Sequence, residues 1–188
     1  MCDLVARTGR HQQRYESGCR LVAGCIPFRY RSSSHDCDAS EKIVEVLMIN
    51  STSGPGLLFP KGGWENDETV EEAAVREAME EAGVRGDLKD LIGHYVFKSK
   101  THQDEFCPDG SCKATMFALF VTEELESWPE QDVRERTWLT IAEAIESCRY
   151  PWMRDALENG FSKWHSDNVV DDGKAPLVGK KGKGSGTS

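Results

Sequence analysis

The fold of this chain is decided by residues 62–84, which read GGWENDETVEEAAVREAMEEAGV. The two leading glycines give the backbone conformational freedom and let it approach a ligand closely. Thr69 followed three residues later by Glu72 has the form of a capping box, which starts a helix. The residues that follow favour helix, and Gly83 is placed to end it. The stretch therefore predicts a glycine turn followed by a helix over 69–83.

The predicted helix carries an unusual concentration of acid on one side. Glu77, Glu80 and Glu81 stand at i, i+3 and i+4, so their carboxylates share one face and repel each other. Arg76 offers partial neutralisation, and a divalent cation offers more, because Mg²⁺ prefers oxygen ligands and binds carboxylates together with substrate phosphates. The alternative is a solvated acidic face without a metal. The glycine turn before the helix and the glycine after it favour the metal site.

This segment resembles the Nudix box in full register, at Gly62, Glu68, Arg76, Glu77, Glu80, Glu81, Gly83 and Val84. One position departs from the box, because Ala78 stands where a bulky aliphatic residue is usual, and this suggests tighter packing of the helix on its sheet. The flanks, residues 59–65 and 80–86, are similar to plant Nudix proteins of the diphosphoinositol polyphosphate and diadenosine polyphosphate hydrolase type. The resemblance covers roughly residues 18–160.

The resemblance implies a fold and a set of site residues. The fold is the α/β class, as a Nudix α/β/α sandwich with a mixed, partly barrel-like sheet. Glu77 and Glu81 are implied as the main ligands of Mg²⁺, for which Mn²⁺ is a possible substitute, with Glu80 and the backbone carbonyl of Lys61 assisting. One box glutamate acts as the catalytic base, with Glu77 preferred to Glu80, and Arg76 orients it. Glu68 is expected to shape the loop, with direct ligation of the metal as the alternative.

Substrate contacts are expected from basic residues at strand ends, because Arg and Lys both recognise phosphate. Lys61 adjoins the box and is expected to touch phosphate, with Gly62 and Gly63 beside it. The other candidates, each of which has a solvated surface charge as its alternative, are Arg20, Lys98, Lys100, Lys113, Arg134 and Arg136. Trp64 is expected to pack across the box loop rather than to stack a nucleobase. His94 and His102 are minor candidates for proton transfer.

Patterning along the chain predicts one domain with two polar ends. Residues 1–17 are expected to be a flexible arm, residues 18–165 the Nudix domain, and residues 166–188 a disordered tail rich in Gly, Lys and Ser. Apolar alternation predicts strands at 19–30, 43–50, 57–59, 91–98, 113–122 and 136–139. Capping signals and Pro151 predict further helices over 140–148 and 151–164.

Composition limits the classes of function. The chain has 188 residues and a net charge of −9, so it is not a general polyanion binder held by bulk charge, and it lacks the aromatic-basic pattern of an RNA-binding module. Its 7 cysteines are an odd number without a CxxC pair, which favours reduced thiols inside the cell. A structural zinc on His102, Cys107 and Cys112 is a minor alternative because their spacing is unusual.

The sequence also indicates where the protein acts and with what. No apolar run is long enough to span a bilayer. We expect a cytoplasmic or nuclear protein, with the mitochondrion as the alternative because arginines outnumber acids in the first twenty residues. We expect a monomer whose partner is a polyphosphorylated small molecule.

The sequence therefore predicts a Mg²⁺-dependent hydrolase of phosphoanhydride bonds, acting on diphosphoinositol polyphosphates, on long diadenosine polyphosphates, or on both. Another nucleoside-diphosphate-linked substrate stays open, namely a dinucleotide, a nucleotide sugar or an mRNA cap. A non-catalytic sensor of phosphate ligands also stays open as an alternative. A domain that has lost catalytic activity tends to lose a charged box residue, however, and this chain keeps all of them.

Overall fold

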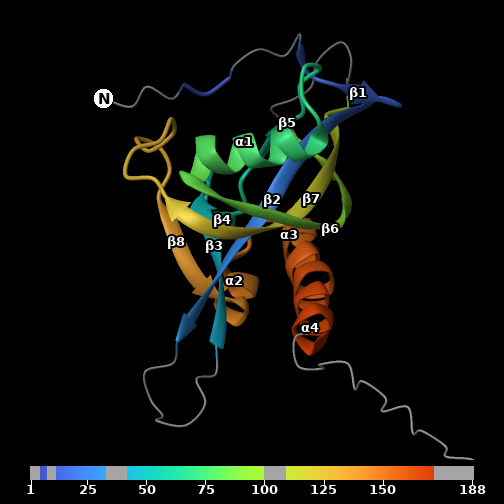
Figure 1. Ribbon diagram of the computed structural model, residues 1–188. Coiled ribbons are helices and arrows are strands. Elements are labelled where there is room, and N and C mark those ends of the chain that lie inside the picture. The colour runs from blue at the N-terminus through green and yellow to red at the C-terminus, as the bar shows by residue number, and fades with distance from the viewer. Residues whose placement is uncertain (1–4, 8–11, 33–41, 100–108, 172–188) are drawn as a thin grey trace, which may run out of the picture.

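The computed structural model describes residues 5–7, 12–32, 42–99 and 109–171 (Figure 1). The strands are β1 (Tyr15–Glu16), β2 (Cys19–Ser32), β3 (Lys42–Asn50), β4 (Leu57–Leu58), β5 (Lys61–Gly63), β6 (Val84–Lys98), β7 (Ser111–Glu124) and β8 (Arg136–Thr140). The helices are α1 (Val70–Ala82), α2 (Ile141–Ser147), α3 (Pro151–Asp155), the π-helical segment η3 (Ala156–Phe161) and α4 (Ser162–Asp171).

The long strand β2 organises the sheet, whose main path runs β4-β3-β2-β7-β6. Its second half pairs antiparallel with β3, and along its length it pairs parallel with β7. The first half of β2 pairs antiparallel with β1 and β5, so residues 22–24 lie directly beside residues 61–63. This pairing fixes the glycine segment of the box against the centre of the sheet.

Helix α1 forms as its capping signals predict. The Thr69 hydroxyl accepts from the Glu72 backbone N–H at 3.2 Å, and the Glu72 carboxylate accepts from the Thr69 N–H at 2.8 Å. Gly83 ends the helix in the left-handed region with φ 62°, a conformation that glycine adopts without steric cost. The helix packs on β2, β5 and β6 through four fully buried alanines, Ala73, Ala74, Ala78 and Ala82. The small residue at position 78 therefore lets the helix lie close to the sheet.

The remaining helices pack on other parts of the sheet. Helix α2 contacts β3 and β8, while α3 and η3 contact β6 (Figure 1). The buried core comprises strand residues such as Ile26 and Leu47, together with Met153, Leu157 and Phe161 from the last helices. Within the described residues, no helix is both long enough and apolar enough to cross a membrane.

The predicted α/β fold is confirmed, with a mixed sheet that helices flank, and the sheet is not closed into a barrel. Several element boundaries differ from prediction. The short strands β1 and β5 were not predicted, and β6 begins at Val84 rather than at residue 91. Register irregularities between residues 85 and 93 break the alternation that would have revealed its first half. The last helical segment runs to Asp171, with a π-helical stretch in it.

Candidate active site

Arg76 lies at the centre of the box and connects its helix to the preceding loop. Its guanidinium donates to both Glu68 oxygens, at 2.7 and 2.9 Å, and to the Gly63 carbonyl at 2.9 Å. The remaining nitrogen, Nη1, donates to Glu77 at 2.7 Å and to Glu80 at 3.2 Å. One arginine therefore neutralises part of the acidic face and holds the loop against the helix.

The Glu77 carboxylate lies between Arg76 and the backbone of Gly62. A β-carbon added to Gly62 would collide with both carboxylate oxygens and the carbon that joins them. Only 7% of the Glu77 surface is exposed, so its charge is largely removed from water. An alanine at position 62 would therefore displace the Glu77 carboxylate from its present position.

The Glu81 carboxylate is held by two groups from outside its own helix, the Lys61 backbone and the Arg134 side chain. The Lys61 backbone N–H donates to its Oε2 at 3.0 Å, and Arg134 Nη2 donates to its Oε1 at 3.4 Å. Because Lys61 belongs to β5 and Glu81 to α1, this bond ties the strand to the helix. The Lys61 peptide and the Glu81 carboxylate therefore lie side by side.

Burial raises the pKa of Glu77, Glu80 and Glu81 and so disfavours their ionised forms. Burial raises the pKa of Glu77, and the neighbouring Glu81 raises it further, against the opposing charge of Arg76. Burial also raises the pKa of Glu81, although Lys61 and Arg134 oppose it, and the pKa of Glu80 is raised mainly by burial too. The arginines thus compensate the acidic face only in part, and an added cation would stabilise its ionised form.

These residues fit a divalent metal that shares its ligands with a substrate. Among the described residues, no three His, Cys, Asp or Glu side chains form a ready metal cage. A hard cation such as Mg²⁺ does not need one, since it is commonly held by one or two carboxylates plus substrate phosphates. Glu77, Glu81 and Glu80 with the adjacent Lys61 peptide supply oxygen donors of that kind.

A cavity of about 590 Å³ opens beside Glu81. It is lined by five cationic residues, Arg20, Lys61, Lys98, Arg134 and Arg149, and by Ser51, Thr52, Ser53, Leu58, Phe97, Ser99, Tyr150 and Trp152. Lys61 and Arg134 both line the cavity and bond Glu81, so they connect the acidic face to the cationic one. The protein as a whole is acidic, and this cavity is where positive charge gathers around the box.

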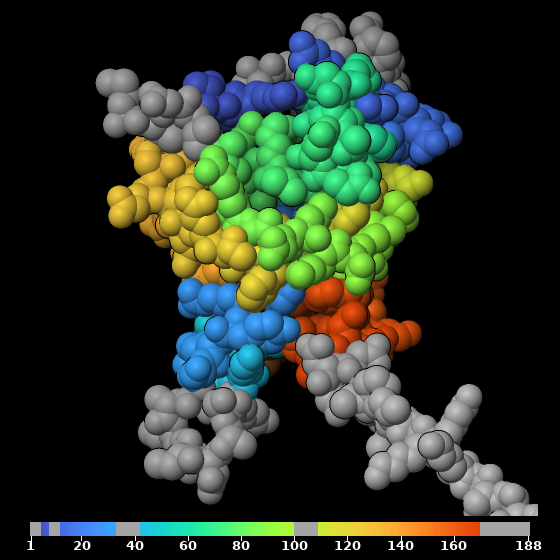
Figure 2. Space-filling view, in the orientation of Figure 1, coloured from blue at the N-terminus to red at the C-terminus, as the bar shows by residue number. Residues whose placement is uncertain are grey.

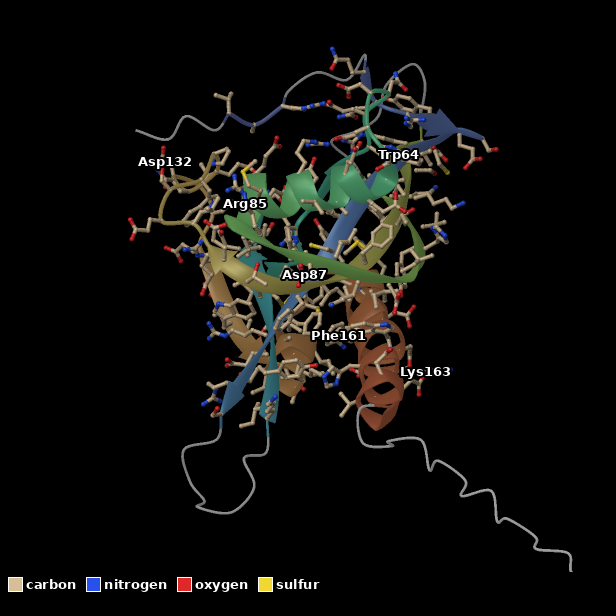
Figure 3. The ribbon with its side chains drawn as sticks, viewed as in Figure 1. Trp64, Arg85, Asp87, Asp132, Phe161 and Lys163 are labelled. Carbon is tan, nitrogen blue, oxygen red and sulfur yellow. The ribbon has the colours of Figure 1, made fainter. Side chains whose placement is uncertain are left out.

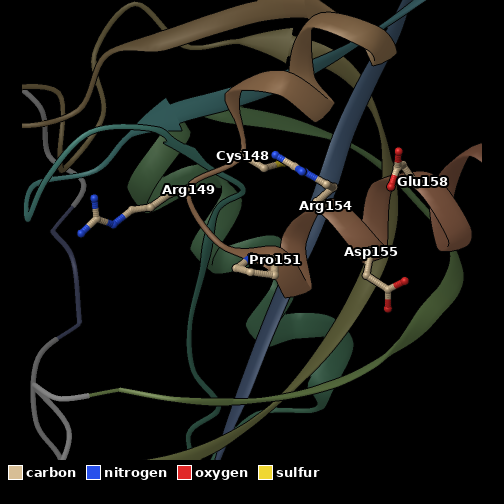
Figure 4. Close-up of a pocket in the computed structure, with 6 residues that line it drawn as sticks. All are labelled: Cys148, Arg149, Pro151, Arg154, Asp155 and Glu158. Carbon is tan, nitrogen blue, oxygen red and sulfur yellow. The ribbon is translucent and has the colours of Figure 1, made fainter.

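A second, smaller cavity lies between α2 and the last helical segment (Figure 4). Its walls come from Cys148, Arg149, Pro151, Arg154, Asp155 and Glu158, and the Arg149 side chain points away from the other five (Figure 4). Arg149 also lines the larger cavity. Burial raises the pKa of the Cys148 thiol to about 11, so this thiol stays protonated at neutral pH. None of the box residues lines this cavity.

Two basic residues proposed to bind substrate lie elsewhere. Arg136 donates to the carbonyls of Ala82, Gly83 and Leu125 at 2.8–3.3 Å, and it stacks on Trp128, so its guanidinium is occupied at the end of α1. Lys113 is 41% exposed at the side chain, lies 4.0 Å from Glu16, and does not line the cavity. The Arg136 guanidinium therefore has a structural role at the end of α1. The Lys113 side chain is a partly exposed surface charge.

The other expected residues are placed as follows. Arg20 is buried, is hydrogen bonded to Gln13 and lines the cavity, as do Lys61 and Lys98. Gly63 has no room for a β-carbon beside Gln13 and Arg20. Trp64 packs across the box loop, with its indole donating to the Glu68 carbonyl at 2.9 Å and Arg14 over its ring (Figure 3).

Of the histidine and cysteine candidates, His94 and Cys112 lie within the described residues. His94 is exposed and bonds Thr115. His102, Lys100 and Cys107 lie outside the described residues. Cys112 is buried on β7, and its thiol donates to the Gly110 carbonyl.

Two contributors to the site were not predicted. Arg7 reaches the box from the N-terminal segment: its backbone N–H donates to Glu80 at 3.2 Å, and its guanidinium donates to Glu65 at 2.7 Å. In Figure 2 the blue surface of the N-terminal segment lies next to the green surface of the α1 region. Arg149 lines the cavity and donates to the Pro55 carbonyl at 2.7 Å. Both contacts join distant parts of the chain, and no local sequence pattern predicts them.

Comparisons with known proteins identify the family and agree with the fold. The NUDIX domain family matches residues 37–160. Nudix hydrolase 16, mitochondrial, of Arabidopsis thaliana is 70% identical over 171 residues, covering 90% of this chain and 95% of that protein. Diphosphoinositol polyphosphate phosphohydrolase 3-alpha of mouse is 38% identical, covering 75% of this chain and 77% of that protein. The Ap4A hydrolase of C. elegans shares the fold, with a TM-score of 0.53 at 22% identity over 78% of this chain and 98% of that one.

These findings define the class of protein as an enzyme that hydrolyses phosphoanhydride bonds in small molecules. The chain belongs to the Nudix hydrolase family. Members of this family generally use divalent metal ions, which agrees with the oxygen donors gathered at the box.

Proposed function

We propose that this chain is a Mg²⁺-dependent hydrolase of diphosphoinositol polyphosphates, of long diadenosine polyphosphates, or of both. One observation carries the proposal: Lys61 and Arg134 hydrogen-bond Glu81 and also line a cavity with five cationic residues. A substrate with several clustered phosphates would fill such a cavity and bring one of its anhydride bonds to the box. The name of the mouse relative supports a diphosphoinositol substrate.

The proposed roles follow from these positions. Glu77 and Glu81 are the main metal ligands, with Glu80 and the Lys61 carbonyl assisting, and Mn²⁺ is a possible substitute for Mg²⁺. A bound divalent metal polarises phosphoryl oxygens and lowers the pKa of a bound water. Arg76 orients Glu77, which is the preferred proton acceptor over Glu80. A base must lie within hydrogen-bond reach of the proton that it removes, and the hydrogen bond from Arg76 to Glu77 Oε1 supports this proposed role.

Arg20, Lys61, Lys98 and Arg134 are proposed to contact the phosphates, with Gly62 and Gly63 allowing the backbone to approach. Arg134 is already held by the Asn50 carbonyl at 2.8 Å and by Glu81, so its guanidinium is oriented before substrate arrives. A preoriented guanidinium loses little freedom on binding a phosphate. The name of the Arabidopsis relative favours the mitochondrion as the compartment, over the cytoplasm or nucleus.

The experiment is hydrolysis of a diphosphoinositol pentakisphosphate and of diadenosine pentaphosphate with Mg²⁺ or Mn²⁺, followed as phosphate or nucleotide release. Glu81→Gln should lower kcat by a factor of at least about 10³, as expected when a metal ligand is lost from a metal-assisted reaction. Glu71→Gln removes an exposed acid from the same helix and should leave kcat unchanged.

A fully active Glu81→Gln enzyme would contradict the proposed metal site. Binding of these compounds without any turnover would instead indicate a sensor of phosphate ligands.

A further inference from the structure

Three side chains form a column along one wall of the larger cavity. The Lys61 ammonium lies 5.3 Å from the centre of the Phe97 ring. The Phe97 ring stacks on Trp152, with centroids 4.9 Å apart and planes inclined by 11°. The three residues come from β5, β6 and α3, and all of them line the cavity. The tertiary fold therefore places a cation on two stacked rings beside the proposed phosphate site.

The Lys61 ammonium is not in direct contact with an acid in the part of the chain that the structure describes, although its charge acts on Glu81 from a greater distance. The ammonium forms no salt bridge among the described residues, whereas the other cavity residue at the box, Arg134, is paired with Glu81. The Lys61 backbone N–H is occupied by Glu81, so the start of the side chain is fixed while its charged end is not. The aromatic face of Phe97 is what the ammonium rests against.

Simple core packing does not account for the column. The indole N–H of Trp152 is buried and has no hydrogen-bond partner among the residues that the structure describes. A buried donor without an acceptor costs stability, and an aliphatic side chain would fill the same space without that cost. Two stacked rings do provide something that aliphatic residues cannot, namely a flat, electron-rich face that attracts a cation.

We propose that Phe97, supported by Trp152, is a positioning residue that holds the Lys61 ammonium ready for a substrate phosphate. A lysine side chain has many rotamers, and ordering it on binding costs affinity. The Phe97 ring restricts the Lys61 side chain before substrate binds, so less conformational entropy is lost on binding. The ring is therefore expected to affect substrate affinity and not the rate of the chemical step. This inference rests on the proposed phosphate-binding function of the cavity.

The test is steady-state hydrolysis of the better of the two substrates by Phe97→Leu and Phe97→Tyr. Phe97→Leu should raise KM about threefold to tenfold, with kcat within about twofold, because a cation–π contact is lost. Phe97→Tyr keeps the ring face and should restore KM. Val96→Ala, at an exposed position on the same strand, is the matched control and should leave both constants unchanged.

A double mutant separates positioning from general damage. If Phe97 acts through Lys61, then Phe97→Leu added to Lys61→Gln should not raise KM further. An equal rise in KM in both backgrounds would overturn the proposal, and so would a fall in kcat that Phe97→Tyr does not restore. If Phe97→Leu does not fold, Phe97→Met removes the ring at similar volume and provides the same test.

Binding of inorganic tripolyphosphate, measured by calorimetry with Mg²⁺, distinguishes this inference from the proposed function. Weaker binding to Phe97→Leu but not to Phe97→Tyr supports the positioning role even if no substrate is hydrolysed. Absence of hydrolysis with binding retained would therefore reject only the proposed function. Absence of tripolyphosphate binding by the unaltered protein would overturn the positioning role itself.

Discussion

Arg76 and Glu68 form a two-point ion pair, in which Nη2 donates to Oε1 at 2.7 Å and Nε donates to Oε2 at 2.9 Å. Both side chains are nearly buried, with 11% and 6% of their surfaces exposed. Burial alone would raise the pKa of Glu68, but the hydrogen bonds from Arg76 and from the Glu65 backbone N–H, together with the charges of Arg76 and Arg7, outweigh burial and hold the pKa below its usual range. The pair fixes the box loop to α1 and leaves Arg76 Nη1 for Glu77 and Glu80.

The first prediction concerns the stability that this pair provides. Arg76→Met should lower the free energy of unfolding by about 3–5 kcal/mol, since it leaves Glu68 buried without its partner. Urea denaturation measures the change. Arg85→Met is the control, because Arg85 is 47% exposed and 3.9 Å from Glu123, and it should change stability by less than about 0.5 kcal/mol. Equal losses in the two variants would contradict a structural role for the Arg76–Glu68 pair.

The second prediction concerns the contact between Gly62 and Glu77. Gly62→Ala should lower kcat by at least about tenfold, because its β-carbon would displace the Glu77 carboxylate, and small displacements of catalytic groups are costly. Gly18→Ala is the control: that β-carbon meets no atom within 4 Å, although its φ of 77° makes the substitution somewhat destabilising. Full activity in Gly62→Ala would show that the Glu77 position is not critical.

Much of this site was predictable because the box is local in sequence. The spacing of Glu77, Glu80 and Glu81 on one helix determines their common face, and the capping residues determine where that helix begins. The partners of these acids were harder to predict. Arg134 and Arg136 are two residues apart, and only tertiary packing decides that one meets Glu81 while the other binds carbonyls at the end of α1.

The contacts that could not be predicted from the sequence join residues that are far apart along the chain. Arg7 and Glu65 are 58 residues apart, and Phe97 meets Trp152 across two elements of different type. No periodicity within either segment encodes such a pairing. The short strand β5 contains two glycines, and glycine is unfavourable in strands, so its pairing with β2 contradicts its local propensity.

The third prediction concerns pH and metal. Because the folded-state pKa values of Glu77 and Glu81 are raised, the contribution of these two acids to the stability of the metal-free protein should be complete below the usual glutamate pKa, about 4.3, and should be lost as pH rises through their raised folded-state pKa values. Mg²⁺ favours the ionised carboxylates, so the rise in Tm that it causes should be larger at pH 8 than at pH 5. Calorimetry with and without EDTA measures both effects. A Tm shift independent of pH, or one unchanged in Glu77→Gln, would contradict this account.

The final prediction uses two lysines that sequence analysis treated alike. Lys98 lines the cationic cavity, whereas Lys113 lies outside it, 4.0 Å from Glu16. Lys98→Gln should therefore raise KM for a polyphosphate substrate about threefold to thirtyfold, consistent with loss of one charged contact worth about 0.7–2 kcal/mol, while kcat stays close to its original value. Lys113→Gln changes net charge equally, so it controls for long-range attraction between the protein and its anionic substrate. If the two variants raised KM by the same factor, the effect would come from the overall field of the protein, and the cavity would lose its assignment as the place where substrate binds.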